Sequence, residues 1–275
     1  GRIGLMMLSV GTGAWRVRNS MNKVSRCLGI TCTADIGLLA ISYTCIEGTD
    51  TYTQSISLPT TGVNTHKLME LELFMKEFPD KVSTCSVKHI HEVLDEIQKF
   101  PANYKAWNLG LASALACGAF TFLLGGGPVE MCCVFLCAGV GNFVRKKMLG
   151  HSISLLANVA VSVAASCLVY VLTILLAQSL LSVSAVHQAG YICAMLFVIP
   201  GFPLITGGID LAKLDLRSGL ERVSYALLII LTATMTGWAT AAICQFQPAD
   251  FEPLQLQKWT LLCFRLITSF CGVYG

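Results

Sequence analysis

The sequence has few charged residues, and those that it has are unevenly placed. Asp, Glu, Lys and Arg make up 13% of its 275 residues, and the mean hydropathy is +0.66, whereas a soluble domain carries roughly 25% charge. Residues 1–106 hold 21 of the 35 charged side chains. This distribution excludes an ordinary water-soluble enzyme and predicts a small globular region followed by a membrane region.

Several motifs that carry chemistry are also absent. The 13 cysteines include no CxxC pair, so neither a zinc site nor thioredoxin-type redox chemistry has the required spacing, and we predict no metal and no cofactor. The nucleotide-binding pattern GxxxxGK[ST] and the hydrolase patterns GxSxG and HExxH are missing as well. A net charge of +3 without a basic run argues against nucleic acid as a partner.

Long uncharged runs begin at residue 107. A helix needs about 20 apolar residues to cross a bilayer, and residues 107–129 and 223–249 each supply such a run. Residues 131–144 form a shorter run, and residues 148–209 contain no Asp, Glu, Lys or Arg and are long enough for two spans. With a further span that begins at Trp259, the sequence predicts five spans and the start of a sixth.

The predicted fold is therefore a polytopic α-helical membrane protein with a small N-terminal α/β cytoplasmic domain. We expect a cytoplasmic domain at 1–106, five spans at 107–258, and the beginning of a further span at 259–275. The basic residues of the short loops give the orientation, because Lys and Arg gather on the cytoplasmic side. The short loops other than those after spans two and four hold no Lys or Arg. The loops after spans two and four hold six: Arg145, Lys146, Lys147, Lys213, Arg217 and Arg222. The N-terminal domain then faces the cytoplasm, and the protein belongs in the cell (inner) membrane.

Apolar periodicity gives the elements of the N-terminal domain. A stripe at every third or fourth residue predicts one helix over residues 3–28, ended by Gly29. Two strands, 36–46 and 51–58, flank a four-residue turn and predict a hairpin. Two more helices are expected over residues 64–78 and 86–100, the second with Ser86 as its N-cap.

Four segments of the chain are similar to a known family. They are 13–21 (GAWRVRNSM), 112–127 (ASALACGAFTFLLGGG), 199–210 (IPGFPLITGGID) and 218–222 (SGLER). Together they resemble the first module of the threonine/serine exporter family. The resemblance implies a secondary exporter whose substrate is threonine, serine or succinate. It also implies a second membrane module as partner, either fused or separate.

The fourth predicted span carries the candidate substrate site. Pro200 and Pro203 each remove a backbone donor, and Gly201, Gly207 and Gly208 lower the cost of unwinding. Broken spans whose freed backbone groups meet the substrate are common in transporters, so we predict a half-helix N-terminus near Pro203 that binds a carboxylate. The alternative is a packing kink.

Four charged residues are candidates for gating or proton relay. Glu130 follows the turn after span one, where the family commonly has Asp, and it is either functional or placed at the membrane interface. Asp210, Arg217 and Arg222 cluster, together with Asp215, near the cytoplasmic end of span four. The alternative for these three is a solvated loop with salt bridges.

Two uncharged polar residues, Asn142 and Asn158, lie in spans two and three. Either contacts with the substrate or interhelical hydrogen bonds explain them.

The function predicted from the whole sequence is export of a small amino acid or dicarboxylate across the lipid bilayer. A membrane-anchored hydrolase-like enzyme and a structural subunit of a membrane complex are the alternatives.

Overall fold

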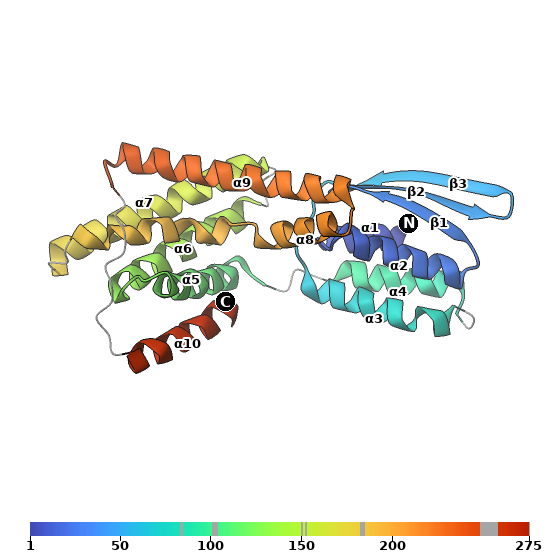
Figure 1. Cartoon of the computed structure of the whole chain (residues 1–275), viewed down its shortest axis with the longest axis horizontal. Helices are drawn as coiled ribbons and strands as arrows, with labels where there is room; N and C mark the ends of the chain where they lie inside the picture. Colours follow the sequence, from blue (N-terminus) through green and yellow to red (C-terminus); the bar gives the residue numbers. More distant parts are fainter. Residues whose placement is uncertain are drawn as a thin grey trace. The chain divides into compact units, whose positions relative to one another are not determined.

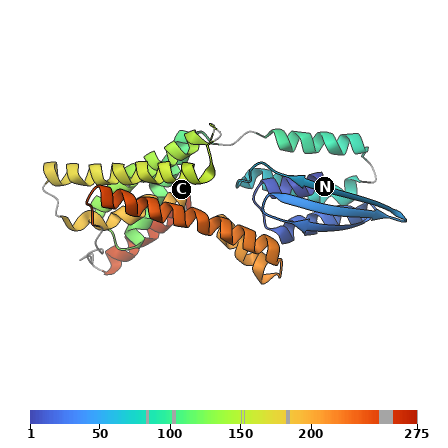
Figure 2. The ribbon, with the colours of Figure 1, turned by 90° about the horizontal axis from the view of Figure 1, so that it is seen from above.

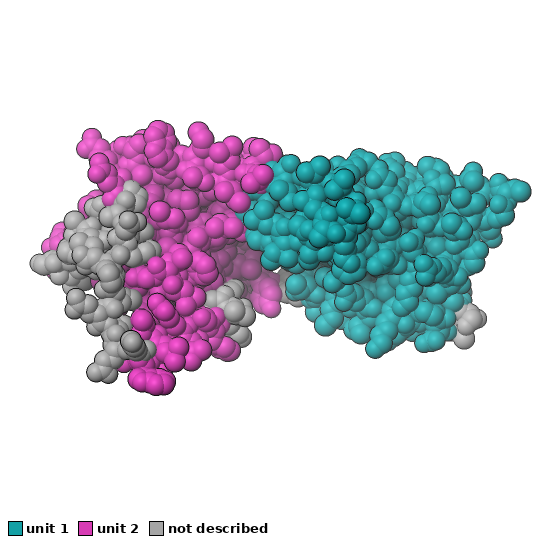
Figure 3. Space-filling model, in the orientation of Figure 1, with its two compact units in different colours: residues 1–102, 200–226 teal, residues 103–199, 227–275 magenta. Residues whose placement is uncertain are grey.

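The computed structural model describes all residues except a few short stretches; the described ranges are 1–82, 85–100, 104–149, 151, 153–181, 185–247 and 258–274. Figure 1 shows the helices and strands along the chain. The chain divides into two compact units, which Figure 3 colours separately. Unit 1 comprises Gly1–Ala102 and Pro200–Ala226, and unit 2 comprises Asn103–Ile199 and Leu227–Gly275. Residues 200–226 thus share a unit with the N-terminal residues, while the boundaries expected from the sequence stay a prediction.

Unit 1 begins with two helices where the sequence predicted one. α1 (Arg2–Ser9) and α2 (Ala14–Cys27) are separated by a short turn, so the prediction of one continuous helix is wrong. Gly11 has a φ of +84°, a conformation that glycine adopts without strain. The apolar stripe nevertheless continues through both helices, and Val17 and Met21 of α2 lie in the core.

A three-stranded antiparallel sheet follows, with the order β1-β2-β3. Its strands are β1 (Thr31–Ile36), β2 (Ala40–Glu47) and β3 (Asp50–Ser57). The predicted hairpin is present, but Glu47 pairs with Asp50, so its loop has two residues and not four. The sequence did not predict β1. The β2–β3 hairpin extends beyond the helices of unit 1 (Figures 1 and 2).

The two other predicted helices are present in unit 1, as α3 (Thr65–Lys81) and α4 (Val87–Lys99). The predicted cap at Ser86 is confirmed, because its hydroxyl accepts from the backbone N–H of His89 at 3.2 Å. The core of unit 1 joins apolar side chains from α1 to α4 with those of the sheet. The short helix α8 (Gly201–Ala212) and the start of α9 (Leu216–Ile243) complete the unit.

Unit 2 contains the long apolar helices. Among the described residues, four helices are long and apolar enough to cross a membrane: α5 (Ala106–Leu123), α6 (Pro128–Met148), α7 (Leu155–Leu181) and α9. Only 33–44% of the residues in the most apolar 18-residue stretch of each helix are buried inside the chain, as expected for helices that contact lipid.

A fifth candidate span is interrupted. The 3-10 helix η1 (Ala185–Val198) ends before residues 199–200, and α8 begins at Gly201. Neither helix is long enough to cross a membrane alone, so the two form one span only together, with a bend between them. A shorter apolar helix, α10 (Lys258–Tyr274), lies where the sequence predicted the start of a sixth span. The multi-pass helical fold with a small α/β region is confirmed.

Candidate functional site

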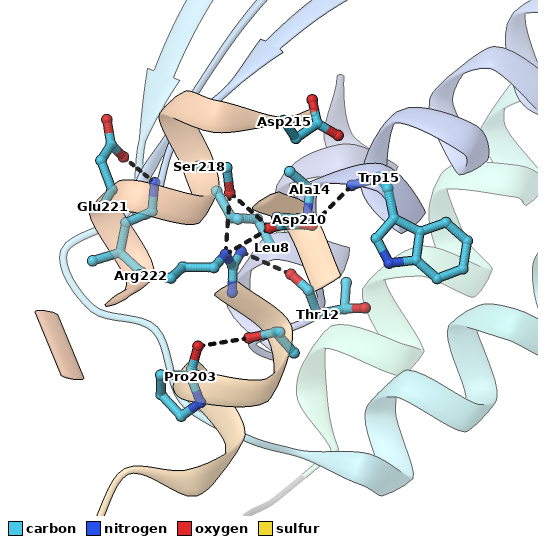
Figure 4. A network of polar contacts seen from close by, with 12 residues as sticks. Leu8, Thr12, Ala14, Trp15, Pro203, Asp210, Asp215, Ser218, Glu221 and Arg222 are labelled. Atoms are coloured by element: carbon cyan, nitrogen blue, oxygen red, sulfur yellow. Dashed lines mark hydrogen bonds and ion pairs between the residues drawn. The ribbon is translucent and has the colours of Figure 1, made fainter. Parts of the chain in front are cut away.

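A buried ion pair joins the two ends of the turn between α8 and α9 in unit 1 (Figure 4). Asp210 is 0% exposed and Arg222 is 2% exposed, and the Arg222 Nε lies 3.3 Å from the Asp210 Oδ2. The hydroxyl of Ser218 bridges the pair, since it donates to Asp210 at 3.0 Å and accepts from Arg222 at 3.2 Å. For these two residues, the alternative of a solvated loop is wrong.

The same ion pair holds the turn between α1 and α2. Asp210 accepts from the backbone N–H of Ala14 at 3.0 Å, so it caps the N-terminus of α2, which its negative charge also favours. Arg222 donates to the backbone carbonyls of Gly11 at 3.2 Å and Thr12 at 2.8 Å. We call Asp210, Ser218, Arg222 and this turn the buried joint. Its charges are paired and hydrogen-bonded, which is what stable burial of charge requires.

Arg217 is separate from the joint and lies at the surface. Its guanidinium pairs with Asp35 and, at 3.2 Å, with Glu221, and its side chain is 61% exposed. Glu221 also accepts from the backbone N–H of Leu38 at 2.6 Å. These contacts tie the start of α9 to the sheet, so for Arg217 the structure agrees with a solvated salt bridge.

The glycines of α8 differ in their surroundings. A Cβ added at Gly207 would lie 3.0 Å from the Cβ of Arg222 and 3.0 Å from a methyl group of Val223, whereas one added at Gly201 or Gly208 would meet nothing within 4 Å. Gly207 therefore permits close packing of α8 on α9. All three glycines lie in regular helix, so they do not mark an unwound segment.

The prolines lie at the start of α8. Pro200 is the N-cap residue, and the helix begins at Gly201, slightly before the position near Pro203 that the sequence predicted. Pro203 falls in the first turn of α8, where a missing N–H is tolerated. Only residues 199 and 200 interrupt the helical stretch.

In unit 2, Glu130 lies in the first turn of α6. Its carboxylate accepts from the backbone N–H of Gly127 at 2.9 Å and it is 5% exposed. Gly190 of η1 packs against both the Cβ of Glu130 and the hydroxyl of Tyr170. Glu130 thus caps its own helix, yet it is buried beside a tyrosine and does not lie at an open surface.

The two predicted asparagines make interhelical hydrogen bonds. Asn142 donates to the backbone carbonyl of Leu109 at 2.9 Å and to the hydroxyl of Ser113, which joins α6 to α5. Asn158, 1% exposed, donates to the backbone carbonyl of Arg145 at 3.1 Å. These bonds agree with the packing alternative, but the Oδ1 atom of Asn158 is buried without a partner.

From the sequence, Arg145 was expected only to set the orientation in the membrane, and Ser166 was not predicted to have a role. The Arg145 guanidinium donates to the backbone carbonyl of Phe197 at 3.2 Å, two residues before the break. The Ser166 hydroxyl lies 2.9 Å from the carbonyl of Cys137 and 2.7 Å from that of Ala194. The regular spacing of polar residues along α7 was the signal in the sequence that could have identified Ser166.

Within the described ranges, no group of three His, Cys, Asp or Glu side chains is placed to hold a metal ion.

Comparisons with known proteins give a family. A family model described as "Putative threonine/serine exporter" matches residues 1–244. The chain is 25% identical over 236 residues to the "Probable succinate transporter subunit YjjP" of Klebsiella aerogenes, covering 85% of this chain and 87% of that protein. It is 24% identical over 237 residues to the protein of the same name from Escherichia coli K12, covering 85% and 88%. No solved structure matches the chain significantly.

Proposed function

The chain belongs to the threonine/serine exporter family, and we propose that it is one subunit of a secondary transporter that exports a small amino acid or a related small carboxylate. The relatives are named transporter subunits, which supports a second membrane module as partner. The proposed location is the cell (inner) membrane, with unit 1 in the cytoplasm as the basic loops predict.

The observation that carries this proposal is the interrupted helical stretch at residues 199–200. A break inside an apolar segment leaves backbone groups without their helical partners, and in a membrane such groups must be satisfied by protein, water or ligand. Here the carbonyl of Phe197, just before the break, is satisfied by the guanidinium of Arg145. A cation held by a backbone carbonyl next to a broken helix is a suitable position for a substrate carboxylate.

Restoring continuity of the helix tests this function. In one α-helix through the break, residues 200 and 203 would donate to the carbonyls of residues 196 and 199, and proline lacks the N–H for this. The double variant Pro200→Ala with Pro203→Ala returns both donors and raises helix propensity. We expect normal abundance in the membrane but a severalfold lower export of threonine, serine or succinate by cells that also express the partner module.

The matched control is Leu204→Ala, which lies in the same turn but leaves both prolines in place. Its export per molecule should stay within twofold of the parent. Export by the double variant at the parental rate, with equal abundance, would mean that the prolines form a packing kink and that the substrate binds elsewhere.

The proposed orientation has its own test. Cys27, Cys32 and Cys85 of unit 1 are partly exposed, so a membrane-impermeant thiol reagent should label them in permeabilised cells and miss them in intact cells. Labelling of these three residues in intact cells, measured by peptide mass spectrometry, would place unit 1 on the outside.

A further inference from the structure

The most apolar helix of unit 2 carries a row of polar side chains on its buried face. The mean hydropathy of α7 reaches 2.5 over 18 residues, yet every fourth residue from 158 to 170 is polar and at most 1% exposed: Asn158, Ser162, Ser166 and Tyr170. We call these four residues the α7 row. The outward face is apolar, with Leu168 and Leu172 more than half exposed. Polar side chains are expensive inside a bilayer and mark functional paths when they face the interior.

The α7 row faces α6 in antiparallel register. Asn158 bonds the carbonyl of Arg145, and eight residues further along α7 Ser166 bonds the carbonyl of Cys137, eight residues back along α6. Between these two contacts lies Gly141, where an added Cβ would be 2.8 Å from the Cβ of Ser166 and 2.6 Å from the ring of Phe197. The row is therefore enclosed by α6 and by η1.

η1 meets the α7 row with one face. In a 3-10 helix residues three apart lie above one another, and Tyr191, Ala194 and Phe197 follow this spacing. The ring of Tyr191 lies 6.0 Å from that of Tyr170, the carbonyl of Ala194 accepts from Ser166, and the carbonyl of Phe197 accepts from Arg145. The C-terminal end of η1 thus lies at the Arg145 end of the row.

Packing explains most of the row but not Asn158. Ser162 bonds the carbonyl of Val159 in its own helix, and Ser166 makes interhelical bonds, which are ordinary roles for serine in a membrane. The amide nitrogen of Asn158 must face the carbonyl of Arg145, because only the nitrogen can donate. That orientation leaves Oδ1 as an acceptor, buried and without a partner, and such a group is costly unless a ligand completes it.

We propose that Arg145 and Asn158 bind the head group of a small amino acid; this rests on the transport function proposed above. The ligand carboxylate replaces the Phe197 carbonyl on the Arg145 guanidinium, because a charged acceptor binds arginine more strongly than a neutral one. The ligand ammonium donates to Asn158 Oδ1, beside the C-terminal end of η1, where helix carbonyls favour a positive charge. A dicarboxylate would bring a second negative charge to these acceptors, so the site selects against it.

The exchange has a consequence for the end of η1. Phe197 also lines a cavity of about 320 Å³ together with Ser113 and other residues of α5, and neither Arg145 nor Asn158 lines that cavity. When the carboxylate takes the Arg145 guanidinium, the Phe197 carbonyl at the end of η1 loses this donor. Binding is thereby coupled to release of the helix end next to the break.

Ligand-dependent thermal stability of the purified full chain in detergent tests this site. L-threonine should raise the melting temperature in a saturable way, and succinate should require at least tenfold higher concentration. Arg145→Gln should raise the Kd for L-threonine at least tenfold, and Asn158→Leu should remove the preference for threonine over succinate. The control Lys147→Gln removes a charge from the same last turn of α6, where the ammonium lies over the ring of Phe143, and should leave the Kd within twofold.

The outcomes separate the site from the function. An Arg145→Gln protein that binds L-threonine like the parent, or a parent that prefers succinate, overturns this site even if cells export normally. If Asn158→Leu does not fold, Asn158→Ser, which retains a smaller acceptor, should fold and still weaken threonine binding severalfold; unchanged affinity contradicts the role of Asn158. Saturable binding without export would leave the site standing and contradict the proposed function, and a parent that shows neither contradicts both.

Discussion

The two units bury charge and polarity in different ways. In the buried joint of unit 1, Asp210 and Arg222 are paired, and each also bonds the turn between α1 and α2. In the α7 row of unit 2, the Oδ1 atom of Asn158 is a buried acceptor without a partner. A network with its charges satisfied contributes to structure, whereas one with an open acceptor can take a ligand. The comparison leads us to expect that the joint serves folding, and it agrees with the binding role that we propose for Asn158.

The largest expected effect is loss of stability when the buried joint is broken. Arg222→Gln or Asp210→Asn alone leaves the other charge buried without its partner, which costs about 3–5 kcal/mol. The double variant should cost less than the sum of the two, because no lone charge remains. Unfolding in denaturant, measured on the full chain in detergent, gives all three values.

Arg217→Gln is the matched control, because its ion pairs are exposed. It should change the free energy of unfolding by less than about 1 kcal/mol. If Arg222→Gln were equally mild, the joint would not be a structural element.

A smaller effect is expected at the contact between α8 and α9 beside the joint. Gly207→Ala adds a methyl group 3.0 Å from the side chains of Arg222 and Val223, and such overpacking typically costs about 1–3 kcal/mol. Gly208→Ala meets no atom within 4 Å and should stabilise the helix by up to about 1 kcal/mol. Thermal melting of the two variants should shift in opposite directions, and equal shifts would contradict the close approach.

Within the α7 row, the two serines should differ. Ser166→Ala removes a hydroxyl that joins α7 to α6 and η1, and interhelical bonds of this kind contribute about 0.6 kcal/mol on average. Ser162→Ala removes a bond inside α7 only and should be close to neutral. Equal stability of both variants would show that η1 is not held through Ser166.

The smallest effect is expected at an exposed ion pair of unit 1. The hydrogen bond from Arg2 keeps the pKa of Asp95 below its ordinary value. A lowered native pKa adds stability above the unfolded pKa, which is about 3.9 for Asp, and this contribution disappears as the pH falls through the native pKa. The small difference between the parent and Asp95→Asn should therefore be constant near neutral pH and vanish once the pH has fallen below the native pKa. A difference that grew on acidification would contradict the pairing.

Composition and periodicity were sufficient to predict the spans and most elements, but not the joint. Uncharged runs locate the long helices because the bilayer excludes charge. The break between α1 and α2 was missed because the apolar stripe continues across it. β1 was missed because its exposed and half-buried positions give a weak pattern. Asp210 and Arg222 were singled out, but their burial depends on partners about 200 residues earlier in the chain, and no local pattern records such a contact.

The most direct test applies one substitution, arginine to glutamine, in both regions and measures abundance and transport per molecule in the same cells. Arg222→Gln should lower the amount of folded protein while the remaining molecules transport at close to the parental rate. Arg145→Gln should keep normal abundance while transport at low substrate concentration falls at least tenfold. The reverse pattern, or an equal loss of both quantities in the two variants, would contradict the division between a structural joint and a binding site at Arg145.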